Sequence, residues 1–267
     1  MQFGIGVSAH IKNWEFIQYA ESLGYDRAWV GDSQMIWSDC YAVLALAAHH
    51  TSRIALGTGV AIISTRIAPV TAHSIASIAE IAPGRTFLGL GTGHTAMRVK
   101  AFREYLRVTR TLLDGQAVDY TYAGETRDIQ FLHRERRFIN LDQRIPIYVA
   151  ANGPKALEAA SEFSDGLITV GGEPEVMQPK LAGVARGAAK VGRTLSDDFH
   201  TAFITTSCVL GAGDKLSDDR VIDETGSWIG CELHFYYEVW TDNGCSDAII
   251  PDYFKPIWPD FCNACKP

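Results

Sequence analysis

Apolar and polar positions divide the first 210 residues into short apolar runs separated by longer amphipathic segments. Between Arg53 and Gly93, two apolar runs, IALGTGVAI and TFLGLGTG, each pass into a glycine-rich end. Neither run alternates apolar with polar residues, which indicates strands buried on both faces, as in a parallel sheet. A segment opened by Pro69 lies between them and is long enough for a helical crossover. This stretch therefore predicts one strand, helix, strand unit.

The same rhythm extends through most of the chain. Strands are expected at 3–9, 27–30, 145–150, 167–170 and 201–210, and helices at 13–23, 39–50, 98–114, 154–163 and 175–191. Asn13 is expected as the N-cap of the first helix and Gly24 as the residue just past its end. Seven strands with helical connections predict the α/β class and a TIM (β/α)8-type barrel.

Two segments depart from this rhythm. Residues 117–144 are polar and broken, which predicts a hairpin inserted on the surface of a barrel domain spanning 1–210. Residues 211–267 are rich in aromatic side chains and show no clear eighth strand with a closing helix, so the C-terminal part is expected to be atypical or shortened. We expect this segment to pack on the barrel. It could cover the mouth of the barrel, form a subunit interface, or be an end that does not fold.

Unusual residues stand at five strand ends. They are Ser8 and His10, Asp32 and Ser33, Gly57 to Val60, Gly91 to His94, and Ala150 to Gly153, with Gly171 and Gly172 close behind the last of these. Ligands of parallel α/β folds bind at the carboxyl edge of the sheet, and glycine lets the backbone approach a flat ring or a phosphate closely. The clusters therefore predict a ligand site at this edge, with Asn152 and Gly153 before a helix as an anion site.

Acid or base chemistry has three candidates among the strand ends. Asp32 could accept a hydrogen bond, transfer a proton or simply cap the following segment, and His10 and His94 also end strands. The remaining histidines lack metal-ligand spacing, and the GxSxG, Walker and kinase motifs are absent from the sequence. GLGTGH matches only part of the dinucleotide signature GxGxxG. No metal site is expected, and the CxxC formed by Cys262 and Cys265 lacks a second ligand pair.

Composition excludes several classes of protein. The chain of 267 residues is 47% hydrophobic and 21% charged, as in globular domains. A net charge of −7 without a basic run argues against nucleic-acid binding. Neither the beginning nor any later stretch has the apolar length of a membrane span, and six irregularly spaced cysteines do not suggest a disulfide framework. We therefore expect a cytoplasmic protein that binds no membrane.

Three stretches resemble the bacterial luciferase-like flavin- or deazaflavin-dependent oxidoreductases. They are GYDRAWVGDSQ, the region from Arg53 to Gly93, and IPIYVAANGPKALEAASEFSDGLI. The branch they resemble is that of the methylenetetrahydromethanopterin reductases, which use the 8-hydroxy-5-deazaflavin coenzyme F-420. The resemblance implies a TIM barrel with the cofactor at the carboxyl ends of the strands. It also implies dimerisation, so a homodimer is expected.

Carried over by position, the resemblance assigns roles to particular residues. It implies that Asp32 lies near the cofactor or substrate and that the Gly59–Val60 peptide bond is cis and lies behind the ring. It further implies that the ring edge and the ribityl phosphate are bound by Gly91, Thr92 and Gly93 and by Ala150, Ala151, Asn152, Gly153, Gly171 and Gly172. The reductases carry acidic residues where this chain has Gly6 and His94, so the resemblance does not extend to the methanopterin substrate.

The leading hypothesis is an oxidoreductase that transfers hydride between coenzyme F-420 and a small organic substrate, with Asp32 first and His10 and His94 next as candidate catalytic residues. An alternative is a monooxygenase that uses reduced flavin mononucleotide (FMN) and oxygen. A third is a flavin-binding protein without turnover. The sequence does not identify the substrate, because apolar pockets leave little sequence signature.

Overall fold

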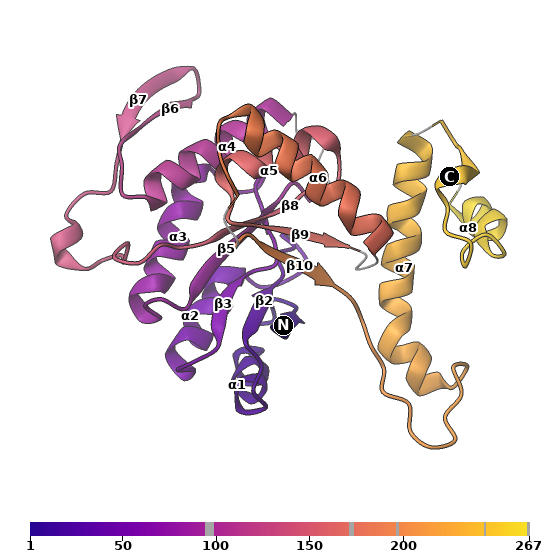
Figure 1. The fold of residues 1–267 in the computed structure, drawn as a ribbon. Coiled ribbons are helices and arrows are strands. Elements are labelled where there is room, and N and C mark those ends of the chain that lie inside the picture. Colours follow the sequence, from indigo (N-terminus) through magenta and orange to yellow (C-terminus); the bar gives the residue numbers. More distant parts are fainter. Residues whose placement is uncertain (94–98, 171–173, 196–197, 243, 266–267) are drawn as a thin grey trace. The chain divides into compact units, whose positions relative to one another are not determined.

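The chain forms two compact units, Met1–Ile204 and Thr205–Pro267. The computed structural model describes residues 1–93, 99–170, 174–195, 198–242 and 244–265 (Figure 1). In the first unit, strands and helices alternate along the chain. In the described residues of the second unit, the regular elements are all helices, and they follow a non-helical stretch.

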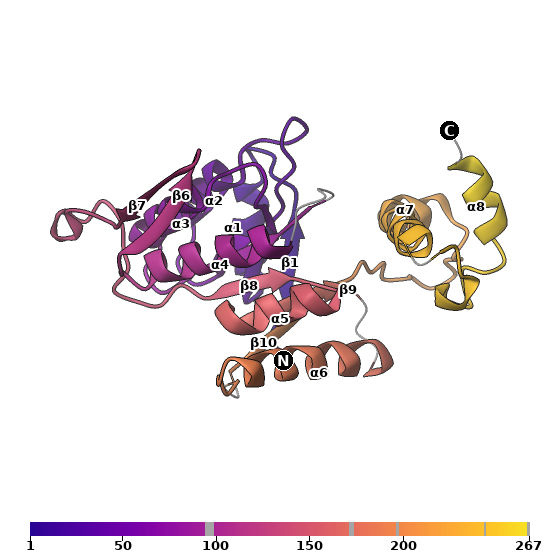
Figure 2. The ribbon, with the colours of Figure 1, turned by 90° about the horizontal axis from the view of Figure 1, so that it is seen from above.

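The first unit is built on a parallel sheet that curls into a nearly closed barrel with helices around it (Figures 1 and 2). Spatial order follows the order in the sequence, and the added strand β4 pairs with β5. The strands on the path are β1 (Gly4–Val7), β2 (Arg27–Val30), β3 (Ala55–Thr58), β5 (Thr86–Gly91), β8 (Ile147–Ala150), β9 (Gly166–Val170) and β10 (His200–Ile204), and β4 is Ala61–Ile62. The predicted TIM-type barrel is therefore confirmed for this unit.

Six helices connect these strands and cover the outside of the sheet. They are α1 (Trp14–Ser22), α2 (Cys40–His50), α3 (Ala68–Ile81), α4 (Val99–Leu113), α5 (Pro154–Phe163) and α6 (Pro174–Lys190). Asn13 stands at the cap position of α1, but its amide donates to the carbonyl of Ser8 instead of capping the helix. Gly24 has a φ of +93° just beyond α1, as expected of a residue that ends a helix.

The interior of the barrel is filled by side chains at the amino-terminal half of the strands. Arg27 Nη1 donates to Tyr148 Oη at 3.1 Å, and its guanidinium carbon lies 5.4 Å from the centre of the Phe87 ring. The Trp29 and Phe87 ring centres are 4.3 Å apart. These side chains fill the barrel toward the amino-terminal ends of the strands. A ligand is therefore expected to enter at the carboxyl edge.

Two predicted strands differ from the observed ones. The run IALGTGVAI was expected as one strand, but it forms β3 and β4, with a cis peptide bond between Gly59 and Val60. The strand expected at 201–210 ends at Ile204, because Ile204 pairs with Val170, the last residue of its neighbour β9. A strand has no ladder to continue once its partner has ended.

The polar segment 117–144 carries an antiparallel hairpin, β6 (Val118–Tyr122) and β7 (Glu125–Ile129), followed by the short 3-10 helix η1 (Arg134–Arg136). Ala123 and Gly124 both have positive φ values, 52° and 87°. Two consecutive residues of this kind form the tight turn whose twist matches that of paired strands.

The second unit contains a helix that the sequence pattern did not reveal. Helix α7 (Asp219–Asp242) precedes η2 (Asp247–Ile249) and α8 (Trp258–Ala264). Leu233, Ile250, Phe254 and Trp258 form its buried core. The sequence shows no clear closing helix after residue 210, because Gly226, Gly230 and many aromatic residues obscure the helical period of α7. In the described part of the chain, no helix is long and apolar enough to cross a membrane.

Candidate functional site

At the carboxyl edge of the barrel, small residues at three neighbouring strand ends pack closely against one another. A Cβ atom on Gly91 would lie 2.6 Å from Val60 Cγ2 and 3.3 Å from Ala150 Cβ. Real Cβ atoms do not come as close to a carbon as 2.6 Å, so Val60 and Ala150 can approach the end of β5 only because residue 91 is glycine. The structure thus brings together three of the residues expected to hold a cofactor.

The same edge depends on two more glycines. A Cβ on Gly59 would lie 2.7 Å from Trp29 Cβ, and Gly93, with a φ of +60°, lies against Ile62. The peptide bond Gly59–Val60 is cis, as the resemblance implies. These glycines let the segment after β3 and the end of β5 lie against β2 and β4, so they have a packing role in the fold as well as a proposed role in binding.

Asp32 lies just beyond β2 and forms a buried ion pair. Its Oδ2 atom accepts hydrogen bonds from Arg66 Nη1 at 2.6 Å and from the backbone N–H of Ile62 at 3.1 Å. Arg66 Nη2 donates to Asp39 Oδ2, also at 2.6 Å. The Asp32 side chain is 2% exposed and that of Arg66 is 16% exposed. Asp32 therefore holds the segment that follows the Gly59–Val60 bond, a role different from the helix cap considered from sequence.

The helix cap is made by Asp39 instead. Its Oδ1 accepts from the amides of Tyr41 and Ala42 at the start of α2. Burial raises the pKa of Asp39, but the hydrogen bonds from Arg66 and from these amides outweigh burial, so the pKa lies below its ordinary value. Asp39 and Asp32 thus both pair with the same guanidinium of Arg66.

Two buried residues of α2, Tyr41 and Cys40, lie close to the ion pair. The Arg66 guanidinium carbon lies 5.2 Å from the centre of the Tyr41 ring, within the range of a cation–π contact. Burial, with the nearby charge of Asp32, raises the pKa of the Cys40 thiol to about 12. Cys40 is therefore a packing residue rather than a nucleophile, since only the thiolate reacts.

Asn152 lies at the end of β8 beside the end of β9. Its Oδ1 accepts from Thr169 Oγ1 at 3.2 Å and from Lys180 Nζ at 3.1 Å. Asn152 and Lys180 also line a cavity of about 250 Å³ between α5 and α6. Helix α5 begins at Pro154 after Gly153, and no side chain caps its first turn. The expected binding segment Ala150 to Gly153 thus lies beside a lysine and an uncapped helix start.

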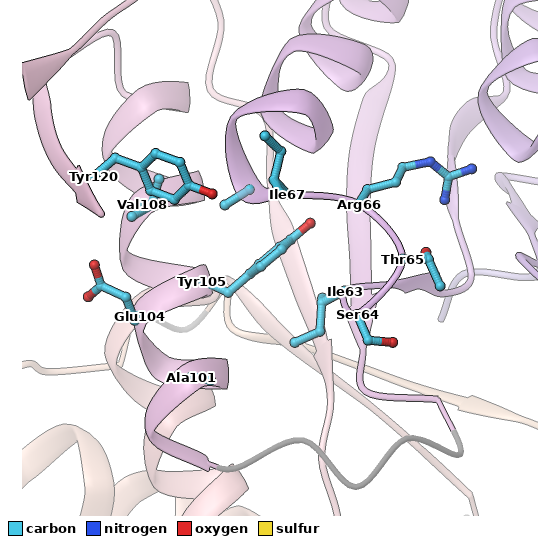
Figure 3. A pocket seen from close by; sticks show the side chains of 11 residues that line it. Ile63, Ser64, Thr65, Arg66, Ile67, Ala101, Glu104, Tyr105, Val108 and Tyr120 are labelled. Carbon is cyan, nitrogen blue, oxygen red and sulfur yellow. The ribbon is translucent and has the colours of Figure 1, made fainter. Parts of the chain in front are cut away.

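A second, larger cavity lies away from these residues. It measures about 330 Å³ between the segment that enters α3, helix α4 and the hairpin strand β6 (Figure 3). Tyr105 and Tyr120 line it, and the Tyr105 hydroxyl lies 2.6 Å from Thr71 Oγ1. None of the described residues expected to bind the cofactor lines this cavity. We place the candidate site at the strand ends because the expected residues converge there, whereas this cavity is outside the sheet.

The histidines are less informative. His10 is exposed, and its Nδ1 accepts from the backbone N–H of Lys12 within its own turn. His94, Gly171 and Gly172 lie outside the described residues.

Among the residues the structure describes, no three His, Cys, Asp or Glu side chains are grouped as a metal site would require. The six cysteines are free thiols.

Sequence reasoning missed Arg66 and Lys180, which contact the expected site residues. Arg66 follows a strand end in STRIAP and Lys180 lies inside a helix, so neither stands in a motif. Their partners, Asp32 and Asn152, are 34 and 28 residues away in the sequence. The charge of Arg66 beside a predicted buried strand end was the one available signal, since buried charges require partners.

Comparisons of the chain with family models and with known proteins agree on one family. The luciferase-like monooxygenase family matches residues 8–223. A 5,10-methylenetetrahydromethanopterin reductase of Methanolobus tindarius is 35% identical over 68% of this chain and 57% of its own length. An F420-dependent glucose-6-phosphate dehydrogenase of Beutenbergia cavernae is 34% identical over 67% of this chain and 58% of its own length.

Among solved structures, the coenzyme F420-dependent tetrahydromethanopterin reductase of Methanopyrus kandleri superposes with a TM-score of 0.62 at 26% identity, over 77% of this chain and 65% of that chain. The chain therefore spans less than two thirds of the length of each of these proteins.

Proposed function

Because the chain belongs to the luciferase-like monooxygenase family, we propose that it is an oxidoreductase that transfers hydride between the deazaflavin coenzyme F-420 and a small organic substrate. The observation that carries the proposal is the surface formed by Val60, Gly91 and Ala150 at the carboxyl edge. One of the relatives named above is called a reductase and the other an F420-dependent dehydrogenase. Both names denote oxidoreductases.

The residues present fit a flat ring system. Gly91 lacks the Cβ atom that would force Val60 and Ala150 apart, so the small apolar groups of these three residues pack together at the carboxyl edge. A planar tricyclic ring gains by lying on such a surface, which removes apolar area from water. We propose that Gly59, Val60, Gly91, Thr92 and Gly93 contact the ring, and that Ala150, Ala151, Asn152, Gly153, Gly171 and Gly172 hold its side chain.

A bound deazaflavin would supply the hydride chemistry, and the protein would orient the reactants and exclude water. Arg66 is held by Asp32 and Asp39 and fixes the segment that leads from Val60 into α3. We propose that Asp32 acts at the substrate or through Arg66, and that His10 and His94 are the residues able to take up or release a proton.

The experiment is a fluorescence titration of the purified protein with coenzyme F-420 and, separately, with FMN. Tight binding of the deazaflavin alone is expected. Preferential binding of FMN would instead favour the monooxygenase hypothesis. Oxygen consumption with reduced FMN would then test that hypothesis. Stoichiometric binding without turnover of any alcohol, imine or alkene would favour a flavin-binding protein. Failure to bind either cofactor would contradict the proposal.

We further propose that the protein is a cytoplasmic homodimer. The dimer is expected from the family resemblance, and the cytoplasmic location from the six free cysteines, which suit a reducing compartment. Light scattering coupled to size-exclusion chromatography measures the mass in solution. A monomer at the concentration of the assay would contradict the dimer.

A further inference from the structure

Helices α5 and α6 lie unusually close together because glycines of α6 face α5. A Cβ on Gly187 would lie 2.8 Å from the Cα atom of Glu158, and one on Gly183 would lie 3.2 Å from Leu157 Cδ1. Lys180 is one turn before Gly183 on the same face of α6. The close approach of the two helices therefore directs the Lys180 side chain over the start of α5 toward the strand ends.

Lys180 reaches acceptors on two adjacent strand ends. Its Nζ donates to Asn152 Oδ1 at 3.1 Å, to the carbonyl oxygen of Val170 at 3.1 Å, and to Thr169 Oγ1. An ammonium group has three N–H donors, so these three acceptors can use all of them. Partial burial lowers the pKa of Lys180. The contacts join the ends of β8 and β9.

The contacts determine how Asn152 is turned. The ammonium of Lys180 can only donate, so the Asn152 atom 3.1 Å from it must be the amide oxygen. The NH2 group of Asn152 then points away from the ammonium, and Asn152 is exposed at the carboxyl edge. Its two N–H groups can therefore donate to an acceptor that binds at the carboxyl edge.

We propose that Lys180 is a positioning residue, which fixes the Asn152 amide so that its NH2 group donates to an oxygen of the bound cofactor. This inference rests on the proposed function. The role differs from direct charge pairing with the cofactor, because the ammonium donors of Lys180 are directed to Asn152, Thr169 and Val170. Nothing in the amino-acid sequence near Lys180 indicates this role.

The test compares the full chain with four variants at Lys180 and Asn152 and with one control variant. Lys180→Met removes the ammonium group but keeps a long apolar side chain, and Lys180→Arg restores donors. Asn152→Ala removes the amide, alone and combined with Lys180→Met. Lys190→Met is the matched control, because it removes the same charge from the exposed last turn of α6, at the other end of that helix from Lys180. The thermal midpoint of each variant shows whether it folds.

Two quantities are measured on each variant. The first is the pair of Asn152 side-chain amide signals in the nitrogen–proton correlation spectrum without cofactor, assigned by its loss in Asn152→Asp. The second is the Kd of coenzyme F-420. We expect Lys180→Met to shift the amide pair and raise Kd about tenfold, which corresponds to about 1.4 kcal/mol. Lys180→Arg should recover part of the loss, and Lys190→Met should change neither quantity.

The double variant distinguishes positioning from direct binding. If Lys180 acts through Asn152, Lys180→Met adds little to the loss already caused by Asn152→Ala. Additive losses would overturn the proposal, and so would unchanged amide signals or an unchanged Kd in Lys180→Met. If the wild-type protein binds no cofactor, the proposed function fails, while the amide signals still test whether Lys180 positions Asn152.

Discussion

Arg66 Nη1 lies 2.6 Å from Asp32 Oδ2, and the other terminal nitrogen of the same guanidinium lies 2.6 Å from Asp39 Oδ2. This arrangement joins the end of β2, the start of α2 and the segment entering α3. Because the Asp32 side chain is 2% exposed, its charge depends on Arg66 as a partner.

Replacing Arg66 by Met is expected to lower the free energy of unfolding by about 3 kcal/mol, because it leaves the buried charge of Asp32 unpaired. Urea unfolding followed by circular dichroism measures the change. Arg127→Met is the control, since Arg127 pairs with Glu125 on the surface and both side chains are more than 70% exposed. Loss of that pair should cost less than about 1 kcal/mol. Equal losses in the two variants would contradict the inferred importance of burial.

Asp32→Asn separates two proposed roles of Asp32 in turnover. If Asp32 acts on the substrate, the substitution should lower kcat by about 100-fold or more, the lower end of what a general acid or base contributes, with little change in cofactor Kd. If Asp32 acts only through Arg66, then Arg66→Met should lower kcat as much. Asp39→Asn is the comparison, because it removes the other partner of Arg66. Unchanged kcat in Asp32→Asn would remove Asp32 from the catalytic candidates.

Gly91→Ala is expected to weaken both packing and cofactor binding, because its Cβ would lie 2.6 Å from Val60 Cγ2. Overpacking of this kind costs about 1–3 kcal/mol. Val60→Ala removes that methyl group, so the double variant should recover part of the stability. Gly230→Ala is the control, since nothing lies within 4 Å of its Cβ position in α7. A double variant as unstable as Gly91→Ala would show that Val60 is not the source of the clash.

Glu21 gives a prediction for the effect of pH on stability. Its carboxylate accepts from the backbone N–H groups of Ser52, Arg53 and Ile54 at 3.0, 2.6 and 2.8 Å. Burial raises its pKa, but these hydrogen bonds and the charge of Arg85 outweigh burial, so the pKa lies below 4.5 in the folded protein.

The unfolded chain therefore binds the proton more tightly than the folded chain does. The stabilisation is fully present above pH 4.5 and is lost as the pH falls through the lower folded pKa. Glu21→Gln should be less stable than wild type by about 1–2 kcal/mol at pH 7. The difference should shrink toward pH 3. Urea unfolding at both values measures it, and a difference that is the same at both would contradict the assignment.

His200 reports on the filled interior of the barrel. Its pKa lies below 6.5, first because burial disfavours the charged ring and second because Arg27 adds a positive charge nearby. Arg27→Gln should therefore raise the pKa of His200 without restoring it fully, since burial remains. A proton NMR titration of the ring signals measures the shift, with Arg53→Gln as a control at an exposed site. A pKa that does not rise in Arg27→Gln would show that the charge of Arg27 is screened from His200.

The sequence by itself determined the architecture of the first unit. Unbroken apolar runs such as TFLGLGTG require burial on both faces, and parallel strands require helical crossovers, so the barrel follows from local pattern and chain connectivity. The glycines at the strand ends were visible for the same reason, since Gly91 and Gly93 interrupt apolar runs where a strand gives way to a loop. Helix α7 of the aromatic second unit was not evident from the sequence, because Gly226 and Gly230 weaken the helical pattern.

Tertiary structure alone decided which residues meet. Asp32 finds Arg66 and Asn152 finds Lys180 across gaps of 34 and 28 residues, and the sequence gives no period that relates them. Ion pairs and hydrogen bonds act over a few ångströms, so they depend on where the strand ends and helices are placed in space. Hydrophobic periodicity fixes the faces of each element, whereas the polar partners at the carboxyl edge are selected only when the barrel has formed.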